Sequence, residues 1–265
     1  MTDPAVGKAK EIPECAVVVV GGTSGVGLAA ARQFAAAGAR GIVLIGRNEE
    51  RAARALAALK QAAPAANVAY FQGDANDIAS ATAAFERALD RFAGVDVLIN
   101  ATAASYVPRL FFRTEVADIG PMLVQQALAP MIMSRLALPA MRGQRSGVII
   151  NVASDAAKVP TPGESVIGAA MAAIVVFSRT LAIEAKRDGI RVNVLTPSLI
   201  GNTDVYERIM ADPFSAKLFS KAASLAHLGV AQPEDIAALM LFLASPAAAR
   251  LTGQAISVNG GISAA

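Results

Sequence analysis

The chain has 265 residues, of which 54% are hydrophobic and 17% are charged, and its formal net charge is +3. This composition provides enough apolar surface for a large packed core and excludes an intrinsically disordered chain. The basic residues are scattered along the sequence, so no nucleic-acid-binding surface is expected, whereas a slight basic excess suits an anionic ligand.

Cysteine and histidine usage narrows the function further, because Cys15 and His227 are each the single residue of their type. A lone cysteine excludes an internal disulfide and fits the reducing cytoplasm. A lone histidine excludes a multi-histidine metal site, and no metal is expected. Residues 1–14 carry both charges without an apolar run, so we interpret them as an N-terminal extension and not as a targeting segment. No stretch approaches the roughly 18 apolar residues of a membrane-spanning helix, so no membrane contact is expected.

The first predicted element is a strand that runs into a glycine-rich turn. Ala16–Val20 is apolar without alternation, which is typical of a parallel strand covered on both faces. The turn Gly21-Gly-Thr-Ser-Gly-Val-Gly27 follows, and an alanine-rich helical pattern continues to Gly38. Glycines allow a tight turn and a close approach of the backbone to a ligand, and a helix N-terminus favours a phosphate. The stretch therefore predicts a dinucleotide-binding turn.

Strand-like and helix-like patterns then alternate to the end of the chain. Further strands are predicted over 41–46, 68–71, 95–99, 147–153, 190–195 and 255–258. Further helices are predicted over 49–63, 78–92, 116–141, 164–188 and 234–243. This alternation predicts an α/β fold, a parallel sheet with helices on both faces, and no internal boundary divides residues 1–265 into two domains.

Such sheets bind ligands beyond the carboxyl ends of their strands, so the residues that follow each strand are the candidate site. After the second strand, Gly46 is followed by Arg47 and Asn48 and not by an acidic residue. A guanidinium at this place favours the 2′-phosphate of NADP(H) over the free ribose of NAD(H). The residues predicted to contact the cofactor are Gly21, Thr23, Ser24, Gly25, Val26, Gly27, Arg47, Asn48, Asp74, Ala75, Asn100, Ala101, Thr102, Pro197, Ser198 and Ile200.

Several motifs along the chain together resemble those of the short-chain dehydrogenase/reductase family. They are the turn 21–27, Gly73-Asp74, the run 96–100, Leu138-Pro-Ala-Met141, the run 151–154, the run 189–193 and the run 253–261. The resemblance covers essentially the full length. It implies one Rossmann-like domain with a doubly wound, seven-stranded parallel sheet, a nicotinamide cofactor, and catalysis by a Ser, a Tyr and a Lys with an Asn on the central helix.

The catalytic pattern of that family is broken in this chain. Ser154 matches the family's serine, but Ile167 and Met171 stand where the resemblance places the Tyr and Lys of Tyr-x-x-x-Lys. Neither side chain can transfer a proton, and losing a positioned general acid costs about 10²–10⁴-fold in rate. The family's central-helix Asn falls near Gln125 and Gln126.

Three other side chains are weak candidates to replace the missing proton donor. Asp155 follows the catalytic serine directly, Tyr106 follows the fourth strand, and Tyr206 lies in the segment 198–228. Glu164 precedes a predicted helix and either faces the cleft or caps that helix; the cap is the favoured interpretation, since acidic side chains suit a helix N-terminus.

Two segments predict contacts beyond the cofactor. The segment 198–228 alternates apolar and basic residues and is predicted to form a lid over an apolar substrate or an acyl thioester. Residues 169–177 are apolar all round a predicted helix, which requires cover on more than one side. We therefore expect a homo-oligomer, a dimer or tetramer, through the helices 116–141 and 164–188, as the resemblance also implies.

Three hypotheses remain open at this point. The first is an NADP(H)-binding oxidoreductase with a non-standard proton donor. The second is a catalytically silent dinucleotide-binding subunit or sensor, because the Tyr and Lys are absent. The third is a non-redox lyase or isomerase on the same scaffold. Membership in the family favours the first by analogy.

Overall fold

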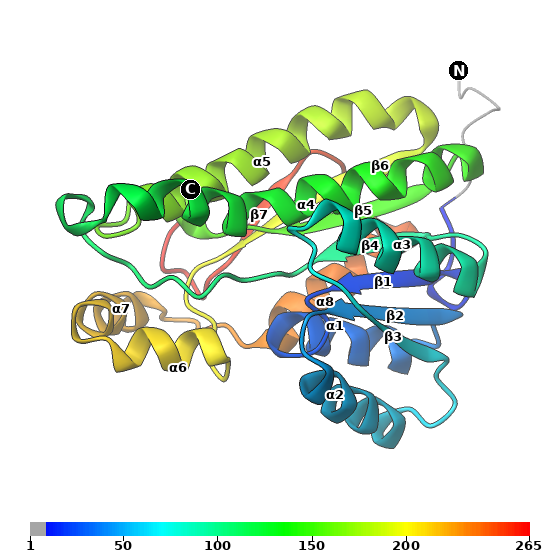
Figure 1. Ribbon diagram of the computed structural model, residues 1–265, viewed down its shortest axis with the longest axis horizontal. Coiled ribbons are helices and arrows are strands. Elements are labelled where there is room, and N and C mark those ends of the chain that lie inside the picture. Colours follow the sequence, from blue (N-terminus) through cyan, green and yellow to red (C-terminus); the bar gives the residue numbers. More distant parts are fainter. Residues whose placement is uncertain (1–8) are drawn as a thin grey trace.

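The computed structural model describes residues 9–265, so the first eight residues of the predicted N-terminal extension lie outside the described residues. Within the described part, seven strands form one parallel sheet in the order β3-β2-β1-β4-β5-β6-β7 (Figure 1). The strands are β1 (Ala16–Val20), β2 (Gly41–Gly46), β3 (Val68–Gln72), β4 (Val97–Asn100), β5 (Gly147–Val152), β6 (Ile190–Pro197) and β7 (Ala255–Val258). The predicted doubly wound, seven-stranded fold is confirmed.

Helices cover both faces of this sheet. They are α1 (Gly25–Ala36), α2 (Glu49–Ala62), α3 (Ile78–Phe92), α4 (Val116–Gln144), α5 (Ser165–Ala185) and α8 (Pro233–Ala244), whereas α6 (Asp204–Ala211) and α7 (Pro213–Leu225) lie elsewhere. Val17 and Val19 pack with α1 and α8 on one face, whereas Val18 and Val20 pack with α3 and α4 on the other. This double cover explains why β1 shows no polar alternation.

The fourth strand begins two residues later than the predicted range 95–99. Asp96, just before it, is 4% exposed and accepts a hydrogen bond of 2.7 Å from the backbone N–H of Ala16. Its carboxylate also pairs with Lys10 at 2.6 Å and with Arg40 at 3.5 Å. Asp96 therefore fastens the start of β1 through its side chain, while its backbone N–H donates to Ala16 O and its carbonyl accepts from Val148 N.

Helices α4 and α5 correct the expectation that no segment is long and apolar enough to cross a membrane. Both pass that test by length and composition, with mean hydropathies of 1.2 and 2.1 over their most apolar windows. Half of the α5 window is buried inside the protein, where it packs against the sheet and α4. The place of α5 in the core therefore accounts for the buried half of its apolar side chains.

The segment 198–228 contains two helices, α6 and α7, that lie beyond the carboxyl ends of the strands (Figure 1). Thr203 caps α6 by accepting a hydrogen bond from Tyr206 N, and Asp212 caps α7 in the same way through Ser215 N. The Ser215 hydroxyl also donates to the carbonyl of Pro108 at 3.4 Å, which ties α7 to the loop after β4. The predicted lid is thus helical and anchored over the sheet edge.

Candidate cofactor and active site

A cavity of about 830 Å³ lies at the carboxyl edge of the sheet. Its walls come from the segments that follow β1 to β6, from α5 and from the helices α6 and α7. Because all strands are parallel, their carboxyl ends meet at one edge, and the strand order reverses between β1 and β4. The cavity therefore occupies the place where a doubly wound sheet binds its ligand.

The glycine-rich turn forms one wall of this cavity and fits a pyrophosphate. Ser24 holds the N-cap position of α1 without a side-chain cap hydrogen bond, so the N–H groups of the first turn are left for a ligand. Gly25 has a φ of +49°, and a Cβ added there would meet only the Thr203 methyl group, at 3.6 Å. A Cβ at Gly21, in contrast, would lie 2.5 Å from the carbonyl oxygen of Ala101. At Gly21 the turn therefore packs tightly against the loop after β4, whereas the space beside Gly25, at the N-terminus of α1, is open.

The segments after β2 and β3 supply groups for a ribose and a base. Arg47 is 65% exposed, and its guanidinium lies 3.8 Å from the carboxylate of Asp74. Arg51 also lines the cavity and pairs with Asp204 of α6 at 2.8 Å. Asn76 lines the same wall, and its Oδ1 is buried without a hydrogen-bond partner. An adenine amino group is a donor of the kind that such an orphaned acceptor requires.

Most of the predicted cofactor residues line this cavity, but Gly27 and Asn100 do not. A Cβ at Gly27 would lie 2.3 Å from the Gly21 carbonyl oxygen, so this glycine permits α1 to pack on the turn. Asn100 is 1% exposed, and its Nδ2 donates to Asn151 Oδ1 at 2.8 Å within the sheet. Gly27 therefore has a packing role, whereas Asn100 Oδ1 is buried without a hydrogen-bond partner. The cofactor contact of these two residues stays a prediction. Those lining the cavity are Gly21, Thr23, Ser24, Gly25, Val26, Arg47, Asn48, Asp74, Ala75, Ala101, Thr102, Pro197, Ser198 and Ile200.

Arg51 and Asn76 are cavity residues that the sequence prediction missed. Arg51 lies in the first turn of α2, where the side chain of Asn48 accepts a hydrogen bond from the Arg51 N–H. This cap fixes the start of α2 beside the cavity. In the sequence, an Asn followed by Glu-Glu-Arg is a recognisable helix start. Nothing in the sequence, however, indicates that Asn76 Oδ1 is buried without a hydrogen-bond partner.

The opposite half of the cavity holds the residues of the broken catalytic pattern. Ser154 follows β5, and its Oγ accepts a hydrogen bond of 3.2 Å from Ala156 N. Ile167 and Met171 of α5 line the cavity, and each is 7% exposed. The α5 side chains at positions 167 and 171 therefore have no ionisable group.

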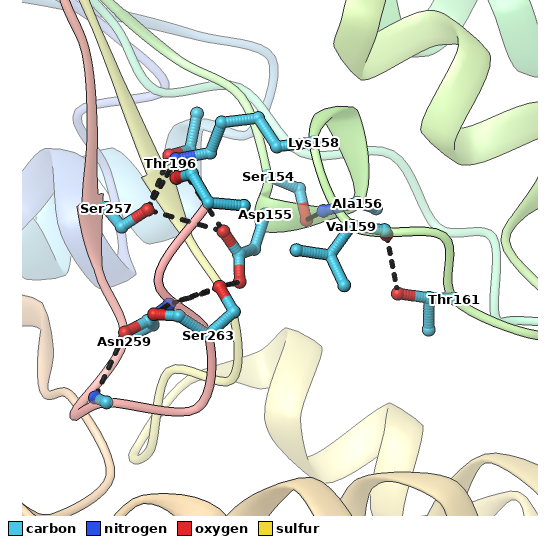
Figure 2. A network of polar contacts seen from close by, with 12 residues as sticks. Ser154, Asp155, Ala156, Lys158, Val159, Thr161, Thr196, Ser257, Asn259 and Ser263 are labelled. Atoms are coloured by element: carbon cyan, nitrogen blue, oxygen red, sulfur yellow. Dashed lines mark hydrogen bonds and ion pairs between the residues drawn. The ribbon is translucent and has the colours of Figure 1, made fainter.

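Asp155, one of the candidate proton donors, is committed to a structural network (Figure 2). Its carboxylate accepts hydrogen bonds from Asn259 Nδ2 at 3.1 Å and from the hydroxyls of Ser257 and Ser263. Lys158 lies 3.8 Å from it and donates to Ser257 Oγ at 2.5 Å. A carboxylate that receives this many donors fixes the segment after β7 to the 3₁₀ turn Asp155–Ala157, and this occupation argues against proton donation.

The remaining candidates lie in the cavity walls. Tyr106 and Tyr206 both line the cavity, as do Gln125 and Gln126 of α4. Tyr106 also packs against the apolar cluster that contains Ile167. The structure therefore brings both phenols to the site without giving either a catalytic hydrogen bond.

The side chain of Glu164 does not cap α5, although the sequence favoured that role. It occupies the N-cap position of α5, but its side chain makes no cap hydrogen bond and lines the cavity instead. The pKa of Glu164 is raised from 4.5 to about 7: burial is the largest cause and raises it, a hydrogen bond with Thr161 lowers it, and the charge of Asp155 raises it. The predicted helix cap is therefore wrong, and the carboxyl group is a titratable group of the site. Within residues 9–265 no cluster of metal-ligating side chains accompanies it.

Comparisons with known proteins agree with this geometry. The family model described as Enoyl-(Acyl carrier protein) reductase matches residues 20–263. The 3-oxoacyl-[acyl-carrier-protein] reductase of Synechocystis sp. is 30% identical over 246 residues, which are 92% of this chain and 95% of the relative.

Two solved structures are similar over nearly the whole chain. L-sorbose reductase from Gluconobacter frateurii, complexed with NADPH and L-sorbose, is 30% identical with a TM-score of 0.85, covering 96% of this chain and 98% of the other. An NADPH-bound short chain oxidoreductase from Pseudomonas aeruginosa, described as containing an atypical catalytic centre, is 28% identical with a TM-score of 0.87, covering 96% and 99%. The sheet order, the glycine-rich turn and these full-length matches together show that the chain belongs to the short-chain dehydrogenase/reductase family of oxidoreductases.

Proposed function

We propose that this chain is an NADP(H)-dependent oxidoreductase that acts on an apolar small molecule or an acyl thioester, with a proton donor other than the usual tyrosine. The observation that carries the proposal is the single cavity in which an uncapped helix N-terminus and Arg47 adjoin an apolar pocket. When bound, NADPH supplies a hydride. Arg47 binds the 2′-phosphate through charge-assisted hydrogen bonds, and the first turn of α1 binds the pyrophosphate. The NADPH-bound relatives support this cofactor.

The substrate half of the cavity supports an apolar ligand. Its apolar lining residues are Val159, Ile167, Met171, Ile209, Leu218 and Phe219. Ser154 holds the polarised oxygen of the substrate by its hydroxyl, while α6 and α7 exclude water from the reacting atoms. The 3-oxoacyl thioester reductases among the relatives make an acyl thioester a suitable substrate class.

The test is a titration of the pure protein with NADPH and NADH, followed by a turnover assay on a panel of ketones, enones, imines and 3-oxoacyl thioesters. We expect tighter binding of NADPH and substrate-dependent NADPH oxidation. Preferential binding of NADH would remove the cofactor assignment. Binding of NADPH without turnover on the entire panel would favour the second candidate.

That second candidate is a catalytically silent dinucleotide-binding subunit or sensor. It is favoured by Ile167 and Met171, because the two α5 positions that face Ser154's half of the cavity cannot move a proton. A silent subunit should co-purify with an active relative from its own cells. Robust turnover by the pure protein would exclude it.

We also propose that the protein acts in the cytoplasm as a homo-oligomer assembled through α4 and α5. Val116 and Val124 of α4 and Val176 and Ile183 of α5 are 47% to 85% exposed, although they are apolar. A second copy of the chain would remove these side chains from water. Sedimentation of the protein should give a dimer or tetramer, and Val176→Arg combined with Ile183→Arg should give a monomer. A monomeric parent protein would contradict this proposal.

A further inference from the structure

Three residues at the start of α5 line the cavity, and only the first of them is titratable. They are Glu164, the N-cap residue that precedes the helix, and Ile167 and Met171 within it. Ile167 and Met171 share one helix face through their i, i+4 spacing, and Glu164 lies three residues before Ile167. The carboxyl group of Glu164 thus lies one helical turn before Ile167 and opens into the same pocket that holds Ser154.

The residue before Glu164 packs against two other segments. Gly163, just before it, has a φ of +87°, and a Cβ added there would lie 2.8 Å from Cε1 of Phe214 in α7. The carbonyl of Gly163 accepts a hydrogen bond of 2.8 Å from the backbone N–H of Arg109, in the loop after β4. Helix α7 and the loop after β4 therefore both pack against Gly163, the residue before Glu164.

The electrostatic surroundings favour the neutral acid. Burial is the largest cause that raises its pKa to about 7, and the carboxylate of Asp155 adds to it. The neighbouring cations act elsewhere: Lys158 binds Ser257 beside Asp155, and Arg208 donates to a backbone carbonyl of the β4 loop at 3.4 Å. Arg109 acts on the carboxylate of Asp212. A carboxyl group poised near neutral pH is suited to general acid catalysis.

We propose that Glu164 is the proton donor of this enzyme, a role that depends on the proposed function as a reductase. Glu164 gives its carboxyl proton to the carbonyl oxygen of the substrate as the carbonyl carbon accepts a hydride. The C=O bond becomes CH–OH, NADPH becomes NADP⁺, and the Glu164 carboxylate regains a proton from solvent. In the reverse direction the carboxylate accepts the hydroxyl proton. The acid has moved one turn along α5 relative to the position held by Ile167.

The experiment compares Glu164→Gln with Glu207→Gln, a control that alters an exposed carboxylate of α6 outside the cavity lining. Infrared difference spectra of the NADPH complex, recorded against pH, detect the protonated carboxyl group directly. We expect a carboxylic acid band that is lost near pH 7 in the parent protein and the control and is missing in Glu164→Gln. Fluorescence titration should show the same NADPH affinity in all three proteins.

Turnover is measured with acetoacetyl-N-acetylcysteamine, a 3-oxoacyl thioester, and with the ketones of the panel. Reduction by the parent protein should fall tenfold per pH unit above about 7. Glu164→Gln should be slower by about 10²–10⁴-fold and lose this pH dependence. A band that titrates at the pH of an ordinary carboxyl group, or a variant with parental rates, would overturn the role of Glu164 alone. Failure of the parent protein to bind NADPH would instead overturn the proposed function.

Discussion

The stability of the fold should depend on pH through Glu164 in a direction that the structure fixes. Its pKa is raised from 4.5 to about 7 in the folded chain. Between these two values the folded state keeps a proton that the unfolded chain has released. The folded state is therefore favoured most below pH 4.5, loses stability as the pH rises toward 7, and keeps a constant penalty above that value.

The magnitude follows from the two pKa values. Each pKa unit corresponds to about 1.4 kcal/mol, so the full penalty of ionising Glu164 in the folded protein is about 3 kcal/mol. Glu164→Gln removes this titration and keeps a side chain of nearly the same shape. Relative to the parent protein, the variant should gain about 3 kcal/mol in unfolding free energy between pH 4.5 and pH 8.

The assay is urea-induced unfolding at several pH values, with the midpoint and the slope fitted together. The difference between variant and parent isolates Glu164 from the other carboxyl groups, and Glu207→Gln serves as the control, since that side chain is exposed. A difference that stays constant with pH, or that grows toward low pH, would refute the assignment of Glu164 as a buried acid.

Three other residues give separate predictions. Arg47→Asp should weaken NADPH binding by about 10- to 100-fold and NADH binding little, because the cofactor group proposed to bind the guanidinium is the 2′-phosphate, which NADH lacks; equal losses in fluorescence titration would remove Arg47 from that contact. Cys15 should resist a thiol reagent at pH 8 until the protein unfolds, because burial raises its pKa to about 12; rapid labelling of the folded protein would contradict this. Asp155→Asn should destabilise the fold by about 3–5 kcal/mol, since it removes the buried carboxylate that lies beside the Lys158 ammonium; an unchanged melting temperature would show that the network in Figure 2 contributes little.

The elements of the fold were predictable because their sequence signals are local. The unbroken apolar run of β1 and the glycines that follow it indicate a covered parallel strand and its turn without knowledge of distant residues. The strand order then follows from the short connections and right-handed crossovers of such sheets. The first residue of a strand is harder to predict. β4 begins at Val97, after Asp96, whose carboxylate binds the backbone N–H of Ala16.

The candidate site was less predictable, because its side chains are directed by contacts between distant segments. Asn100 follows the pattern of a ligand-contacting residue, but its amide is held by Asn151 of the neighbouring strand. Asp155 is drawn toward Asn259, which is 104 residues away in the sequence. The sheet register and the course of the last segment determine these hydrogen-bond partners. The residues that flank each motif in the sequence therefore do not predict them.

Glu164 shows why the proton donor and the cofactor contact can change independently. The glycine-rich turn between β1 and α1 forms one wall of the cavity, whereas Ile167 and Met171 reach the cavity from α5. Substitutions at Ile167 and Met171 therefore leave the turn at Gly21 untouched. The N-cap position of α5 lines the same cavity three residues before Ile167, and the preceding residue, Gly163, lies against Phe214 of α7. A carboxyl group placed there acquires the neutral-pH acidity that a tyrosine would need a neighbouring cation to reach.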